Sequence, residues 1–188
     1  MKYNATVFQH QFPIVKTFLQ HAVYYRLASA AYATYQVKDE YWVATINAHC
    51  LQAIINWCMV FGADGCNATH WKNLATTDGK YLLDDFRTQC LATLQITPKG
   101  WHEYWGQMTS FRNEYAAHRQ LDSSCPVPAL DTAFRIAHFY DKWIRKVILP
   151  DVFDEPSLHI SEAKFTSNAK PLIEALMNQT KQMEETIV

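Results

Sequence analysis

Residues 40–61, EYWVATINAHCLQAIINWCMVF, decide the fold class, because their apolar side chains recur at helical spacing. Steps of three and four residues place these side chains on one broad face, which predicts an amphipathic helix from about Glu40 to Phe61. Gly62 and Gly65 then interrupt the pattern. The side chains on the predicted buried face are Val43, Ile46, Cys50, Ala53, Ile54, Trp57 and Phe61.

The same spacing continues on both sides of this segment. Thr97 is a suitable N-cap with Pro98 at the first helical position, and two prolines in DSSCPVP, residues 122–128, predict a break. PDVFDEPSLHI, residues 150–160, is expected to be an irregular connection. The other predicted elements are Ile14–Val37 after Pro13, a short turn or helix at His70–Leu74, Lys80–Gln95, Pro98–Arg119, Ala129–Leu149 and a polar helix at Ala169–Glu185.

The predicted architecture is all-α, an up-and-down helical bundle of about five to six helices. Neither strand-like alternation nor an internal repeat is present in the sequence. Residues 1–150 form the expected bundle, and residues 151–188 form a C-terminal connection and helix that belong to the same domain or are an appendage to it.

The composition is that of a globular protein. The chain has 188 residues, of which 49% are hydrophobic and 14% aromatic, enough for one domain with its own core. The formal net charge is −1, which argues against a protein that coats nucleic acid through a uniformly basic surface. Contact with RNA would therefore require a local patch.

The expected location is the cytoplasm. Five scattered cysteines do not resemble a disulfide framework, and the N-terminus lacks the apolar core of a signal peptide. We find no uninterrupted apolar stretch approaching about 18 residues, so we expect no contact with a membrane.

The candidate site is FRNEYAAHRQ, residues 111–120. On an ideal helix Arg112 and Arg119 align with an aromatic stripe, His118 falls on its margin and Asn113 points elsewhere. A charge on an apolar face is costly unless it is paired or faces a cleft or interface. Arg112 therefore either pairs with a carboxylate of another helix or faces a polar cleft. To bring Arg112, Asn113 and His118 together in one site, the end of the helix must bend or a second copy of the chain must contribute.

The motif resembles that of a known family. RNEYAAH, residues 112–118, is similar to the R-x(4–6)-H motif of HEPN domains, in which asparagine often follows the arginine. FRNEYAAHR resembles the branch of the family found in abortive-infection systems. NWCMVFGADGCNATHWKNL, residues 56–74, resembles the second helix and following loop of these proteins. The resemblance covers roughly residues 10–150.

The resemblance implies a metal-independent endoribonuclease that acts as a homodimer, with a HEPN-like bundle and neither cofactor nor metal. Arg112, Asn113 and His118 would be its catalytic residues, and Arg119 would add affinity for RNA phosphates. Histidine titrates near neutral pH and suits a general base or acid, whereas arginine can hold the charge of the transition state. The expected products carry a 2′,3′-cyclic phosphate and a 5′-OH.

The resemblance also implies a role as a toxin or phage-defence effector, with an antitoxin protein as a further partner. Some HEPN toxins carry a tyrosine two residues after the histidine, and a partner enzyme modifies this tyrosine. This chain has Gln120 at that position, which argues against control by that route.

Two alternatives remain open. The chain could be a non-catalytic HEPN-like module that binds RNA, a nucleotide or a protein, because many such domains keep the fold without catalysis. It could also be a helical interaction protein with no role in nucleic-acid chemistry. A metal set made of His49, Cys50, Cys58, Cys66 and His70 is disfavoured, because its cysteines lack close metal-binding spacing and suit a buried structural role.

Overall fold

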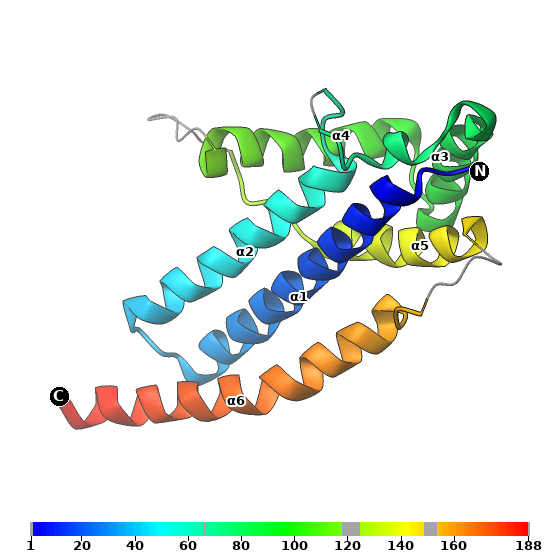
Figure 1. Ribbon diagram of the computed structural model, residues 1–188. Coiled ribbons are helices and arrows are strands. Elements are labelled where there is room, and N and C mark those ends of the chain that lie inside the picture. Colours follow the sequence, from blue (N-terminus) through cyan, green and yellow to red (C-terminus); the bar gives the residue numbers. More distant parts are fainter. Residues whose placement is uncertain (1, 66, 118–124, 149–153, 188) are drawn as a thin grey trace.

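The computed structural model describes residues 2–65, 67–117, 125–148 and 154–187, and these residues form an all-α helical bundle (Figure 1). The prediction of fold class is therefore confirmed. The α-helices are α1 (Ala5–Tyr35), α2 (Glu40–Phe61), α3 (Tyr81–Leu94), α4 (Pro98–Phe111), α5 (Asp131–Val147) and α6 (Leu158–Ile187). Short helical segments occur at η1 (Trp71–Leu74), η2 (Thr77–Gly79) and η3 (Arg112–Ala117).

The long helix α1 lies between α2 and α6, and α3, α4 and α5 gather towards the end of the bundle at which α1 begins (Figure 1). The core there is rich in aromatic rings. Phe61 packs edge-on against Tyr140 and is stacked on Phe86, which in turn is stacked on Trp71 with ring centroids 4.4 Å apart. This aromatic core supports the loop between α2 and α3.

Helix α1 begins nine residues earlier than predicted, at Ala5 rather than Ile14. The side chain of Asn4 caps the helix by accepting a hydrogen bond from the Val7 amide at 3.2 Å. Pro13, expected to precede the helix, lies inside it on the solvent-exposed side. Proline removes one helical hydrogen bond, but Phe12 and Val15 beside it are buried in the core, and their packing holds the helix together.

Helix α6 also begins earlier than expected, at Leu158 instead of Ala169. The predicted irregular connection is therefore wrong from Leu158 onwards. The buried carboxylate of Asp141 accepts a hydrogen bond from the Leu158 amide at 3.0 Å, and Leu158 itself is buried. Further along α6, Met177 is buried against α1 and α2, so this helix is packed along the bundle.

Helix α2 is the one helix in the described part of the chain that is long and apolar enough, by length and composition alone, to cross a membrane. Core helices of soluble proteins often meet the same criterion. Here α2 packs along α1 and buries Ala53, Ile54 and Trp57 in the core, as its sequence pattern predicted. Val43, expected on the same face, is 41% exposed, so the predicted buried face does not extend to the first turn of the helix.

Candidate functional site

The helical geometry changes at the start of the RNEYAAH motif. Helix α4 ends at Phe111, and Arg112–Ala117 form the π-helical segment η3. The prediction of a regular α-helix continuing to Arg119 is therefore wrong over this segment. A π-helix turns more slowly per residue than an α-helix, so the ideal wheel no longer gives the directions of side chains beyond Phe111. Such segments are frequent at functional sites.

Arg112 is partly buried and carries an unsatisfied donor. Its Nε atom is buried and has no hydrogen-bond partner, and no carboxylate of the described residues forms an ion pair with its guanidinium group. The guanidinium group contacts the thiol of Cys58. Burial raises the pKa of the Cys58 thiol to about 12, with a smaller opposing effect from Arg112. The alternative in which Arg112 pairs with another helix thus has no counterpart among the described residues.

Arg112 lines a surface pocket of about 340 Å³ between the end of α2 and the following loop. The loop is pinned to α2, because Asn67 Nδ2 and Thr69 Oγ1 donate to the Met59 carbonyl oxygen at 2.6 Å and 2.9 Å. The loop side of the pocket is therefore held in place by hydrogen bonds, and Arg112 lines the same pocket. Its lining residues are Ile55, Cys58, Met59, Ala63, Gly65, Asn67 and Arg112.

The other predicted site residues are only partly located. Asn113 follows Arg112 in η3 and is exposed. Tyr115 is stacked on Phe111, with ring centroids 5.0 Å apart. His118 and Arg119 lie outside the described residues, so the structure gives the positions of Arg112 and Asn113 alone.

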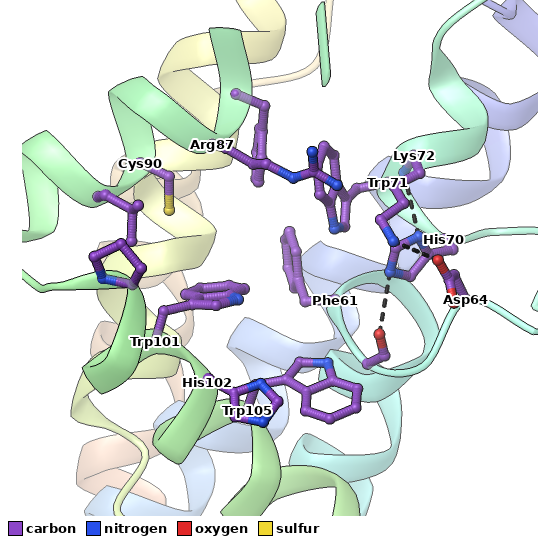
Figure 2. Close-up of a pocket in the computed structure, with 14 residues that line it drawn as sticks. Phe61, Asp64, His70, Trp71, Lys72, Arg87, Cys90, Trp101, His102 and Trp105 are labelled. Carbon is purple, nitrogen blue, oxygen red and sulfur yellow. Dashed lines mark hydrogen bonds and ion pairs between the residues drawn. The ribbon is translucent and has the colours of Figure 1, made fainter. Parts of the chain in front are cut away.

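The same loop lines a larger pocket of about 440 Å³ through Gly62 and Asp64 (Figure 2). The indoles of Trp71, Trp101 and Trp105 line it, with Arg87 and Lys72 among its polar residues. Sequence reasoning missed this pocket, because it assigned the tryptophans to core and interface packing. Trp101 and Trp105 are only half-buried, and the local signal was the dense aromatic run WHEYW, residues 101–105.

His70 fixes the base of the loop that separates the two pockets. Its side chain is 2% exposed. Its Nε2 atom lies 3.1 Å from the Gly62 carbonyl oxygen, and its Nδ1 atom accepts from the Lys72 amide at 3.3 Å. This pattern requires a neutral ring with its proton on Nε2. Burial, assisted by Lys72, lowers the pKa of His70 to about 4.

Acidification is expected to destabilise the protein through His70. Because the folded pKa is about 4 and the ordinary value is 6.5, the unfolded chain binds a proton more readily between these values. The contribution of His70 is complete above pH 6.5 and falls by about 3 kcal/mol as the pH drops towards 4. Urea unfolding of wild type and His70→Gln at pH 7.5 and 4.5 tests this expectation. An unchanged pH dependence in His70→Gln, with exposed His10→Gln as the control, would contradict it.

His138, His159 and Glu162 form the one group of three or more metal-binding side chains in the described ranges. Their donor atoms lie within 4.8 Å of one another, and histidine with carboxylate suits Zn²⁺. However, the imidazole rings are stacked in nearly parallel planes, 9° apart, with centroids separated by 4.0 Å. In-plane lone pairs from such rings cannot converge on one ion at about 2.1 Å, so one ring would have to rotate.

These three side chains form a contact between α5 and α6 as they stand. His138 Nε2 lies 2.7 Å from Glu162 Oε2.

The metal set considered from the sequence, which begins with His49, does not form one cluster among the described residues. His49 Nδ1 lies 2.8 Å from His21 Nδ1, while Cys50 and Cys58 are buried core residues. Cys66 of that set lies outside the described residues.

Comparison of the chain with protein-family models, curated proteins and solved structures finds no match in any of the three.

Proposed function

We propose that this chain is a metal-independent endoribonuclease of HEPN type that acts as a homodimer. The observation that carries the proposal is the state of Arg112: a partly buried cation with an unsatisfied Nε atom, lining a pocket beside a π-helical segment. The sequence resemblance assigns this same residue to the catalytic motif.

An arginine in this state favours an anionic ligand. A buried donor without a partner costs free energy, and no carboxylate of the described residues compensates the positive charge. A phosphate in the pocket that Arg112 lines would compensate this charge, and arginine binds phosphate through two parallel hydrogen bonds. The arrangement therefore supports a role in binding the phosphodiester group of RNA.

The proposed reaction uses the RNA as its own nucleophile. His118 removes the proton of a ribose 2′-OH, whose oxygen attacks the adjacent phosphorus. The bond from phosphorus to the 5′-oxygen of the next nucleotide breaks, and this oxygen takes up a proton from the protonated His118 or from water. Arg112 stabilises the extra negative charge of the transition state, and Asn113 orients the phosphate or the histidine. Arg119 adds affinity for a neighbouring phosphate. The products carry a 2′,3′-cyclic phosphate and a 5′-OH.

In the proposed assembly two copies of the motif meet in one cleft, as they do in the family that the sequence resembles. A cytoplasmic enzyme of this kind would act as a toxin or phage-defence effector, held in check by an antitoxin protein. The non-catalytic alternative, a HEPN-like module that binds RNA, a nucleotide or a protein, predicts binding without cleavage.

The proposal is tested by incubating the purified protein with single-stranded RNA in EDTA and identifying the ends of the fragments. We expect cleavage without divalent cations and fragments with cyclic-phosphate and 5′-OH ends. Cleavage that requires an added metal ion, or fragments with 3′-OH ends, would contradict the mechanism.

A further inference from the structure

The larger pocket has the features of a site for a flat aromatic ligand. Its volume of about 440 Å³ lies within the range of about 300–1,000 Å³ that is typical of sites for small molecules. Trp101 and Trp105 present half-buried indoles to it, and Trp71 and Arg87 lie on the opposite side (Figure 2). The cavity thus offers aromatic surfaces on two sides.

Arg87 is the charged group of the pocket that can approach an anion next to that ring. Arg87 and Lys72 are cations, whereas Asp64 is the one carboxylate among the lining residues. Lys72 is paired with Asp64, and Arg87 forms an exposed ion pair with Asp84 at 3.6 Å. The side chain of Arg87 is 53% exposed and lies 5.7 Å from the centre of the Trp71 ring. An exposed pair of this kind contributes little free energy, so a phosphate can replace Asp84 as the partner of Arg87. Arg87 is therefore placed to approach a phosphate at the rim while remaining beside the aromatic wall.

The position of the pocket relates it to Arg112. Helix α4 carries Trp105 at the pocket, and Arg112 follows directly after the end of this helix. Seven residues of helix correspond to about 10 Å, a separation that neighbouring nucleotides of one strand can bridge. The loop with Gly62 and Asp64 in the larger pocket contributes Ala63 and Gly65 to the pocket of Arg112. The two pockets are thus adjacent, with one loop between them.

We propose that the larger pocket holds a nucleobase of single-stranded RNA, stacked on Trp101 or Trp105, while a neighbouring phosphate lies at Arg112. This inference rests on the proposed function, because it assigns to the pocket a base of the same substrate. Stacking on aromatic side chains tolerates any base and contributes about 1–3 kcal/mol per base. Paired bases are not free to enter the pocket, so the substrate class is unpaired RNA.

The test measures binding separately from cleavage. A short single-stranded RNA with 2′-O-methyl groups cannot be cleaved through its own 2′-OH, and its binding is followed by fluorescence anisotropy. We expect Trp105→Leu to weaken binding by about 5-fold to 150-fold, the range that corresponds to the loss of one stacked base. An abasic strand of the same length and backbone should bind to wild type and to Trp105→Leu with equal affinity. Circular dichroism and thermal unfolding verify that the variant is folded.

Arg87→Gln provides a second test. The Arg87 side chain is exposed, so this substitution should affect folding less than a substitution of Trp105. It should weaken the binding of both strands, with and without bases, and reduce the dependence of binding on salt, because one phosphate contact is lost. Lys164→Ala, an exposed substitution on α6, is the matched control and should leave binding unchanged.

The outcomes separate the two proposals. If wild type cleaves RNA but Trp105→Leu and Arg87→Gln bind as wild type does, the pocket inference is overturned and the nuclease stands. If binding depends on Trp105 and on the bases but wild type cleaves no RNA, the pocket inference is supported and the nuclease proposal fails. Binding of a protein segment in the pocket, with no affinity for either strand, would overturn the inference.

Discussion

Replacing Arg112 by alanine is expected to lower the rate of RNA cleavage by about 100-fold to 1,000-fold, the usual effect of removing one donor to transition-state charge. Arg112→Lys should recover only part of the rate, because an ammonium group cannot form two parallel hydrogen bonds to phosphate. Single-turnover rates with saturating enzyme measure the effect, with Lys164→Ala as a control of equal charge change.

The same variants distinguish catalysis from structure. Arg112 forms no ion pair with a described carboxylate, so Arg112→Ala removes no ion pair among the described residues and should unfold at a temperature close to that of wild type. A large loss of stability together with a near-normal cleavage rate would identify Arg112 as a structural residue and contradict its proposed role.

Replacing Asp141 by alanine is expected to reduce the free energy of unfolding by about 3–5 kcal/mol. The carboxylate is 1% exposed and accepts hydrogen bonds from Arg145 Nε at 2.8 Å and from the Leu158 amide at 3.0 Å. Its loss leaves a partly buried guanidinium group without this partner and removes the contact that fixes the start of α6.

Urea unfolding of Asp141→Ala measures this effect, and Asp154→Ala, at an exposed position, should change stability little. Hydrogen exchange should also show that the first turn of α6 loses protection in Asp141→Ala. A loss below about 1 kcal/mol would show that the buried carboxylate does not anchor α6.

The local sequence pattern predicted those elements whose boundaries depend on nearby residues. Helix α2 extends from Glu40 to Phe61 as expected, because Asp39 caps its start and its apolar spacing is regular. Helix α4 begins at Pro98 for a similar reason, with the Thr97 side chain accepting from the Gly100 amide at 3.1 Å. These signals lie within a few residues of the helix ends.

The errors arise where distant residues determine the structure. Pro13 is tolerated inside α1 because of packing in the core, and α6 begins at Leu158 with help from Asp141 on another helix. The π-helical segment after Phe111 breaks a spacing that looks regular in the sequence. The pocket of Trp101 and Trp105 depends on how α4 meets α3 and the loop, which a wheel for one helix cannot give.

The candidate site was predictable to a different degree. The wheel indicated that Arg112 required either a counterion or a cleft, and the structure shows a pocket and no described counterion. It could not indicate the π-helical turn or the neighbouring aromatic pocket. The roles of Arg112, Asn113, His118 and Arg119 in RNA cleavage remain predictions.

The most direct test of the central proposal is an RNA cleavage assay in EDTA that compares wild type with His118→Ala, after both proteins have been shown to be equally folded and equally dimeric. We predict that wild type produces fragments with 2′,3′-cyclic phosphate ends and that His118→Ala produces none. Equal cleavage by both proteins, or no cleavage of any single-stranded RNA by wild type, would contradict the assignment of a HEPN-type ribonuclease.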